Sequence, residues 1–345
     1  MYITSLKAIS PQSTYDESFF SGNITVHSGN KYKALEPNYT GLINPNLLRR
    51  MGKSIRMGIG AGFQLIQGEE NIDGIILGSS EGGLEDCIKF LNQIVTYNEG
   101  TLTPTNFVQS TPNALAGNLA LMSQNTCYNI THVHKGQAFE NSLLDAFLLF
   151  GEGKAKTILL GNVEEISDYN FNIETSAGQF KVEETTSENL LSSSTKGTVC
   201  GEGSTMFILK ANATEYFAKI LDVDQISYPT ENEIQSLIRK FLEKNNLTPN
   251  DIDALVLGYN GDSRTDFWYT NVANTIFPQQ AIYSYKNYVG EYPTAIAFGT
   301  YLAAYLLSGK SISILPLKHS SKPIKRILVY NHSNGIQHGV ILMSA

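Results

Sequence analysis

The sequence has few cysteines, and they lie far apart. Its 345 residues contain only 3 of them, Cys87, Cys127 and Cys200, and no two form a CxxC pair. This spacing excludes a disulfide framework and a zinc knuckle. His132 and His134 share one face of a short predicted strand, but the nearby sequence offers no third ligand. We therefore expect no metal ion and no cofactor.

Basic residues are outnumbered by acidic ones. The chain has 25 Lys and Arg against 32 Asp and Glu, which gives a net charge of −7 at pH 7. A general nucleic-acid-binding protein needs clustered Lys and Arg to neutralise phosphates, so the composition argues against that class. The local basic segment 47–57, LLRRMGKSIRM, is still suited to attract an acidic partner.

Long apolar runs are missing as well. The most apolar segment, 294–308, is too short and too interrupted to span a bilayer. The first ten residues, MYITSLKAIS, lack the basic and long apolar regions of a signal peptide. We therefore expect a cytoplasmic protein without a membrane partner.

Strand-like and helix-like segments alternate along the chain, whose length and 42% hydrophobic content allow a large core. Such alternation is typical of an α/β protein with mixed sheets covered by helices. The parts 1–210 and 211–345 echo one another without a strict repeat. The predicted strands include 1–10, 72–80, 155–163, 325–333 and 339–345, and the predicted helices include 45–67, 83–96, 111–123 and 292–309.

Three motifs have both a functional and a structural interpretation. GIGAG at 58–62 resembles a dinucleotide-binding loop, but it continues a helical pattern, which favours packing glycines. GSSEGG at 78–83 follows a strand but lacks the lysine and spacing of a phosphate-binding loop. Asp262, Arg264 and Asp266 allow a catalytic acid cluster, although a solvated ion pair on a loop is the simpler interpretation.

A strand–turn–helix corner is predicted around residues 130–153. The β-branched run that ends at His134 is followed by a turn, and helical spacing begins at Ala138. Such corners often present a nucleophile, because a helix N-terminus stabilises an anion and lowers the pKa of a cysteine. Here Gly136 and Gln137 stand at the corner, and neither is a nucleophile. The corner is therefore either a scaffold or an active site without its reactive atom.

Several segments, in order along the chain, resemble the β-ketoacyl synthases, the condensing enzymes of the thiolase fold. The most specific is KGTVCGEGSTMFILK, which is similar to the G-x-x-x-G-E-G-A strand of that family. The others are LLRRMGKSIRM, TPTNFVQSTPNALAGNLAL, THVHKGQAFENSLLDAFLLFGEG, NDIDALVLGYNGDSRTD and YSYKNYVGEYPTAIAFGTYLAAYLL.

The resemblance implies a fold and a division into domains. We expect a five-layered α/β/α/β/α thiolase-like fold made of two similar halves. Residues 1–210 would form the N-terminal half, which carries the corner, and residues 211–345 the C-terminal half. The chain is shorter than typical family members, so some loops around the active site should be trimmed.

The resemblance also implies which site positions have changed. In the family a cysteine at the corner takes the acyl chain as a thioester, and two histidines assist decarboxylation and stabilise the oxyanion. Gly136 takes the cysteine position, or Gln137 does if the alignment shifts by one residue. Asn260 and Glu291 stand at the two histidine positions, while Lys286 is retained. We therefore expect no intact catalytic set.

A chain-length factor, which is a condensing-enzyme homologue without the cysteine, is the family precedent for such a chain. We expect a non-catalytic subunit that pairs with an active β-ketoacyl synthase in type II polyketide or fatty-acid-like biosynthesis, for example of aryl polyene or flexirubin pigments. Acyl carrier protein would be a further partner. Two alternatives stay open: residual activity such as decarboxylation of malonyl-carrier protein, and a scaffolding homodimer without an acyl ligand.

The pairing surface can be predicted from the same resemblance. Thiolase-fold dimers join through the strand before the corner, which here spans residues 126–133. Its β-branched and aromatic residues suit pairing with a neighbouring strand. Cys127, Tyr128, Ile130 and His132 are the predicted interface residues.

Overall fold

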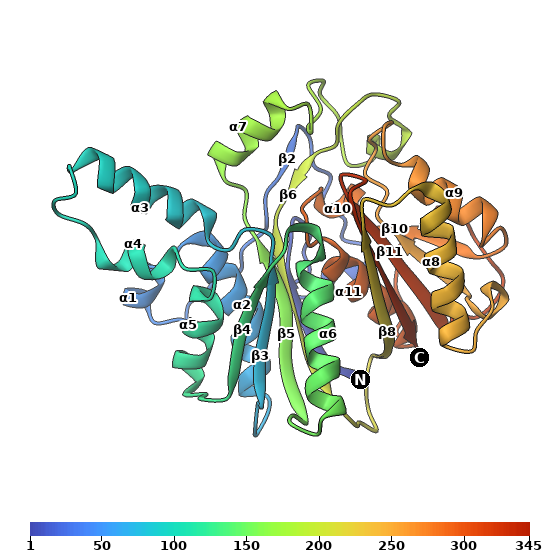
Figure 1. Ribbon diagram of the computed structural model, residues 1–345, viewed down its shortest axis with the longest axis horizontal. Helices are drawn as coiled ribbons and strands as arrows, with labels where there is room; N and C mark the ends of the chain where they lie inside the picture. Colours follow the sequence, from blue (N-terminus) through green and yellow to red (C-terminus); the bar gives the residue numbers. More distant parts are fainter.

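The computed structural model describes all 345 residues and is a mixed α/β protein (Figure 1). The strands are β1 (Tyr2–Ile9), β2 (Lys31–Tyr32), β3 (Gly74–Ser79), β4 (Tyr128–Val133), β5 (Thr157–Glu164), β6 (Cys200–Gly201), β7 (Gly203–Lys210), β8 (Ala218–Ser227), β9 (Ala254–Leu257), β10 (Ala281–Ser284), β11 (Arg326–Ser333) and β12 (Gln337–Ser344). The α-helices are α1 (Pro45–Leu48), α2 (Lys53–Gln67), α3 (Leu84–Thr96), α4 (Pro104–Gln109), α5 (Ala114–Ser123), α6 (Ala138–Gly151), α7 (Asp168–Ser176), α8 (Glu231–Lys244), α9 (Phe267–Thr275), α10 (Lys286–Val289) and α11 (Ile296–Leu307). None of these helices combines the length and the apolar character that a bilayer crossing requires.

Ten strands form one sheet in the order β10-β9-β11-β12-β8-β1-β7-β5-β3-β4. Each half of this sheet follows the same plan. Three strands run parallel, namely β4, β3 and β5 in one half and β10, β9 and β11 in the other. The last strand of each half, β7 or β12, lies antiparallel between that group and the first strand of its half. Two residue pairs, Tyr2 with Lys219 and Ile3 with Ala218, join the halves.

Helices separate and cover the two halves of the sheet. On the outer face of the first half, α2 packs on β1, β5 and β7, and α5 packs on β3 and β4. Between the halves lie α6 and α11, which share a 40-residue apolar core with strands of both. The outer face of the second half is covered by α8 and α9, which share a further apolar core with β9, β11 and β12. The expected five-layered α/β/α/β/α arrangement is confirmed, whereas a domain boundary at residues 210 and 211 stays a prediction.

The sequence of each helix suits its layer. In the central helix α11 every residue except Leu306 is buried, and a helix that is apolar on all sides belongs in an interior. By contrast, α8 is amphipathic and begins with a capping box, in which Thr230 and Glu233 satisfy one another's backbone N–H groups. It therefore covers the sheet from the solvent side.

The predicted helix 45–67 is interrupted, and that prediction was wrong in the middle. The chain leaves the helix after Leu48 and re-enters it at Lys53. The side chain of Gln109 satisfies the free backbone groups of the break, because it accepts from Gly52 N (3.2 Å) and donates to Arg50 O. Gly58–Gly62 lie inside α2, where Gly58 and Gly60 leave no space for a Cβ atom beside Leu115 and Tyr39. These glycines therefore pack the helix closely against its neighbours.

Glu140 is an unusual member of the central layer. Its side chain lies on α6, is only 1% exposed, and has no hydrogen-bond partner for Oε2. The backbone of β12 at Gly339 approaches the carboxyl so closely that no side chain would fit there. Burial raises the pKa of Glu140 to about 8, so the carboxyl is protonated at neutral pH.

A pH-dependent stability follows from this carboxyl. The folded state must keep a proton that the unfolded chain releases above about pH 4.5, so the free energy of unfolding should fall as the pH rises towards 8. Each pKa unit between the folded and the unfolded state corresponds to about 1.4 kcal/mol of unfolding free energy. The variant Glu140→Gln has no proton to release. Its free energy of unfolding, measured by denaturant titration, should therefore decline less steeply between about pH 5 and pH 8. The surface change Glu243→Gln serves as the control, and an unchanged slope in Glu140→Gln would refute the assignment.

Candidate functional site

The corner between β4 and α6 is formed by the short 3-10 turn Lys135–Gln137. Lys135 has a φ of 50°, a left-handed conformation that residues other than glycine seldom adopt. Its side chain is 62% exposed, lines a cavity and forms an ion pair with Glu81. Strained residues of this kind cluster at functional sites. The place of Lys135 in the cavity wall could not be predicted, because residue type does not reveal the backbone angles of a turn.

Gly136 and Gln137 are not among the residues that line the cavity, and both contact the second half of the sheet. The N–H of Gly136 donates to Gln337 Oε1 at 2.8 Å, and a Cβ atom at Gly136 would overlap Ser333. Gln137 is buried, donates to Ile226 O (3.0 Å) and accepts from Ser227 Oγ (3.0 Å). Which corner residue corresponds to the family's cysteine stays a prediction.

The three other predicted site residues meet in space. Asn260 Nδ2 donates to Glu291 Oε2 at 2.7 Å. Lys286 Nζ lies 2.6 and 2.9 Å from the two oxygens of Glu291 and also donates to His332 O. Lys286 is completely buried, and a buried ammonium needs a counter-charge, which Glu291 supplies. The arrangement is an internally neutralised cluster in which no imidazole is available for proton transfer.

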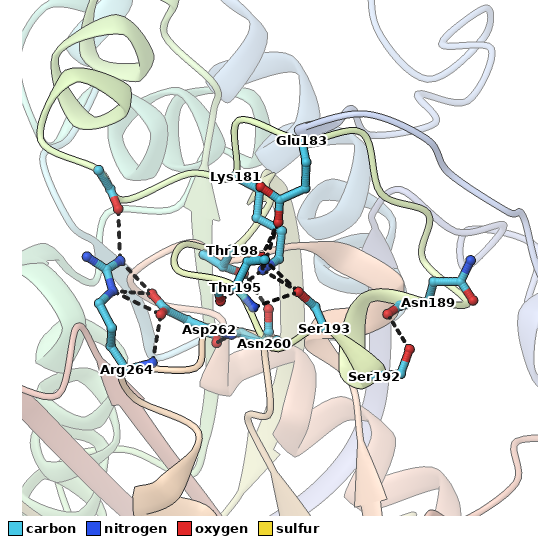
Figure 2. Close-up of polar contacts among 12 residues, drawn as sticks. Lys181, Glu183, Asn189, Ser192, Ser193, Thr195, Thr198, Asn260, Asp262 and Arg264 are labelled. Carbon is cyan, nitrogen blue, oxygen red and sulfur yellow. Dashed lines mark hydrogen bonds and ion pairs between the residues drawn. The ribbon is translucent and has the colours of Figure 1, made fainter.

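The turn that carries Asn260 is held from two sides. Asp266 accepts from the N–H groups of Asn260 (3.0 Å) and Gly261 (2.8 Å), and Thr198 Oγ1 donates to Asn260 O at 2.7 Å. Asp262 and Arg264 form an ion pair at 2.6 Å (Figure 2). The expected ion pair is present, but Asp262 is buried rather than solvated. Asp262 and Asp266 therefore stabilise the conformation of the turn.

A Ser/Thr-rich loop, residues 183–197, covers this turn and is fastened by a buried lysine. Lys181 Nζ donates to Ser193 Oγ (2.8 Å) and to Thr195 Oγ1 (2.9 Å), as Figure 2 shows. The N–H of Ser263 in turn donates to Thr195 O at 3.1 Å. The carbonyl of Leu190 packs against Gly261, where a side chain would not fit. The loop is thus a fixed wall of the site region.

The cavity beside the corner has a volume of about 360 Å³. Its walls come from the corner, from α7, from the loop after β3 and from the segment that begins at Glu291. Lys135 is the only basic residue that lines it. Five acidic residues line it as well: Glu81, Glu164, Glu165, Glu174 and Glu291.

Cys200 is the only cysteine in the cavity wall. It is buried, and burial, followed by the charges of Glu174 and Glu202, raises the pKa of its thiol well above the ordinary value. The thiolate is the nucleophilic form of cysteine, so Cys200 cannot replace a corner cysteine. Cys127, which precedes β4, is exposed and lies outside the cavity.

His132 and His134, the residues considered as metal ligands, have other contacts. His132 Nε2 lies 3.0 Å from Asp145 Oδ2, and His134 Nδ1 lies 2.7 Å from Asn141 Nδ2. No three His, Cys, Asp or Glu side chains come together in a way that would hold a metal ion.

Solved condensing enzymes share this fold. A β-ketoacyl synthase from Burkholderia phymatum STM815 aligns with a TM-score of 0.79 and 15% identity over 99% of this chain and 98% of its own. A chain from the complex of a ketosynthase with its chain length factor from Xenorhabdus doucetiae aligns with a TM-score of 0.77 and 16% identity over 100% and 97% of the two chains. The ishigamide ketosynthase/chain length factor aligns with a TM-score of 0.79 and 13% identity over 100% of this chain and 98% of its own. No functionally curated protein matches this sequence.

The fold is that of the condensing enzymes. The family model for the β-ketoacyl synthase N-terminal domain matches residues 27–199, which is half of the chain. The chain belongs to the β-ketoacyl synthase family, as its sequence motifs indicated.

The thiols should behave according to their burial. Incubation with an acyl thioester, such as an acyl N-acetylcysteamine, should leave the intact mass unchanged, because no thiol stands at the corner and Cys200 stays protonated. Iodoacetamide should modify Cys127 rapidly and Cys200 only after unfolding. Peptide mass spectrometry measures both. A stoichiometric acyl group on Cys200 in the folded protein would overturn this interpretation of the site.

Proposed function

We propose that this chain is a non-catalytic subunit that pairs with an active β-ketoacyl synthase in type II polyketide or fatty-acid-like biosynthesis. The observation that carries the proposal is the corner itself, which has no thiol and whose Gly136 N–H is already bonded to Gln337. Condensation needs a nucleophile and free donors for the oxyanion, and this corner offers neither.

The edge of the sheet supports pairing. β4 is the terminal strand on its side, so its outer backbone N–H and C=O groups have no strand partner, and such edges readily accept another strand. Tyr128 and Val133 are exposed on the strand, and the flanking helices expose Leu121 on α5 and Leu148 on α6. Half-buried Ile130 and His132 lie between the two ends of β4. We propose this strand, with Cys127 before it, as the centre of the subunit interface.

The solved structures include precedents for such a subunit. One is a ketosynthase in complex with its chain length factor, and another is a type II polyketide synthase acyl-carrier protein in complex with its ketosynthase bound to the hexaketide. By analogy we propose an active ketosynthase and an acyl carrier protein as partners. Aryl polyene or flexirubin pigments as products, and a cytoplasmic location, stay predictions.

Residual decarboxylation of malonyl-carrier protein is the weaker proposal. The cavity is lined by five glutamates and a single lysine, and this excess of carboxyl groups disfavours the carboxylate of a malonyl group. If Glu291 takes a histidine position of the family, as its motif predicts, it also replaces an imidazole with a carboxylate. A scaffolding homodimer uses the same edge strand and is distinguished by experiment.

The first test concerns assembly. Co-expression with the Cys-bearing β-ketoacyl synthase of the same genome should give a heterodimer by size-exclusion chromatography with light scattering. Val133→Asp should disrupt it, because a charge on the exposed end of β4 would then be buried in the proposed interface. Val182→Asp, at a highly exposed position outside the helices and strands, is the matched control. A homodimer that excludes the synthase would favour the scaffolding alternative. Intact pairing of the Val133→Asp variant would show that the β4 edge is not the interface.

The second test locates the nucleophile position. Because Lys135 lines the cavity and Gly136 does not, we expect Lys135→Cys to be acylated by a thioester faster than Gly136→Cys combined with Ser333→Gly, which removes the overlap of a Cβ atom at Gly136 with Ser333. Intact mass measures the acyl adduct. Faster acylation of the Gly136 variant would instead place the nucleophile position at Gly136.

Neither cysteine variant should form carbon–carbon bonds. Losing one oxyanion donor costs roughly 3–4 kcal/mol, or two to three decades of rate, and we propose that Asn260 and Glu291 replace both histidines here. Adding Asn260→His and Glu291→His should help only partly, since Glu291→His leaves the buried Lys286 without its counter-charge. Product analysis by mass spectrometry is the measurement. Carbon–carbon bond formation by the unmodified chain alone would refute the proposed function.

A further inference from the structure

The bases of this chain are concentrated in the connection between α11 and β11. The whole chain has a net charge of −7, yet no Asp or Glu follows Glu291. Residues 308–326, which we call the basic segment, contain five bases and no acid and so carry a formal charge of +5. The five are Lys310, Lys318, Lys322, Lys325 and Arg326. A strongly basic surface on an acidic protein suits an anionic partner.

The basic segment is fixed along an open edge of the sheet. β10 is the terminal strand at the end of the sheet opposite β4. The N–H of Leu317 donates to Ile282 O of β10 at 2.7 Å, and the N–H of Ile282 donates to Lys318 O at 3.0 Å. Ile314 is only 3% exposed and belongs to the apolar core between the two halves. The side chains that this segment exposes therefore have defined places.

Two of these exposed side chains are leucines. Leu315 is 73% exposed and Leu317 is 53% exposed. They alternate with the buried Ile314 and the half-buried Pro316, as in an extended chain, so the two leucines share one side of the segment. Lysines follow directly. The surface thus offers apolar side chains and ammonium groups together, which matches the boundary between the headgroups and the acyl chains of a bilayer.

Most of the bases are free to meet a partner. Of the five only Lys310 forms an ion pair, with Glu17 at 3.8 Å. The nearby carboxylate of Asp253 accepts from the backbone N–H groups of Lys325 (2.8 Å) and Arg326 (2.9 Å), which leaves both side chains without a carboxylate partner.

The basic segment lies far from the cavity. Arg326 begins β11, and Lys318 bridges to the start of β10. The cavity is lined by Ser333, at the other end of β11, and by Glu291, which follows β10. The 8 residues of β11 separate the two regions by about 25 Å. The C-terminus of the chain lies at the same end of the sheet as the basic segment (Figure 1).

Other anionic partners fit this surface less well. Protein interfaces are enriched in Arg and depleted in Lys, whereas four of the five bases here are Lys. A nucleic acid would neutralise the lysines but would leave the leucines in water. Clustered lysines beside exposed apolar side chains are a pattern by which proteins bind anionic lipid surfaces. The net negative charge of the chain does not prevent this, because charges more than about 10 Å apart are largely screened at about 0.1 M salt.

We infer that the basic segment binds the surface of an anionic lipid bilayer. Leu315 and Leu317 insert among the headgroups, and the lysines lie against the lipid phosphates. The chain lies on the bilayer and does not cross it, in keeping with its helices. This binding goes beyond the proposed function, because it uses the β10 end of the sheet and leaves the β4 edge free for a synthase.

The test is co-sedimentation of the full chain with two kinds of vesicle at about 0.1 M NaCl. One kind is phosphatidylcholine alone, and the other contains about 30% phosphatidylglycerol. The chain should partition at least about tenfold more strongly onto the anionic vesicles, and about 0.5 M NaCl should weaken this binding. No binding, or equal binding to both kinds of vesicle, would overturn the inference; an acidic protein as the true partner of this surface would give that result.

The first variant tests the lysines. Lys322→Gln combined with Lys325→Gln removes two charges from exposed positions and should weaken binding to the anionic vesicles about 25-fold, or about fivefold for each lysine. Lys33→Gln combined with Lys196→Gln is the matched control, because both residues are exposed and lie beside β2 and β6 near the cavity. Equal loss of binding in the two variants would refute the location.

The second variant tests the leucines. Leu315→Ser combined with Leu317→Ser keeps every charge and should weaken binding about tenfold, because less apolar surface leaves water. Thermal unfolding verifies that each variant is folded, and unchanged binding would refute insertion. The result is independent of the proposed function: a chain that binds anionic vesicles but does not pair with a synthase loses only the latter.

Discussion

The ion pair between Lys286 and Glu291 is the interaction on which the site region depends. Lys286 begins α10 after β10, and its buried ammonium joins the carboxylate, the carbonyl of His332 on β11 and, through Glu291, the amide of Asn260 after β9. The backbone of Glu291 also pairs with the strand at Cys200, which belongs to the first half of the chain. The two charges thus join three segments, and the backbone pairing of Glu291 adds the segment at Cys200. Removing either partner would leave an isolated charge in the interior, which is far more costly than an exposed one.

The corner between β4 and α6 is bonded to the second half of the sheet. In a condensing enzyme the N–H groups at the start of the helix are kept free for an oxyanion. Here Gly136 donates to Gln337 of β12, and the side chains of Gln337 and Gln137 contact one another. These two bonds join the corner to the second half of the sheet. They satisfy polar groups of the corner within the chain itself.

Periodicity predicted an α/β protein, and the family resemblance predicted its five layers and singled out Asn260, Lys286 and Glu291 as site positions. Both kinds of signal are carried by whole elements and motifs. The direction of the corner could not be predicted. It depends on the left-handed backbone at Lys135, and lysine is a common residue on any surface. The contribution of α7 (Asp168–Ser176) to the cavity was missed for a similar reason. This helix has little amphipathic character, so its sequence does not indicate which face is buried, and its place in the cavity wall follows only from its packing near β6. β10 and α9 were also missed, since β10 has only 4 residues and α9 mixes polar and aromatic residues without a clear period.

The position of β1 in the middle of the sheet constrains how the chain reaches this structure. Its partners β7 and β8 lie about 200 residues further along, so β1 leaves the ribosome long before either exists. Contacts of such large sequence separation slow folding, because a long loop must close before any pairing energy is gained. Until then β1 presents two open edges. The first half therefore cannot complete its sheet during synthesis before residue 210 has emerged, and in that interval the nascent chain depends on protection from aggregation.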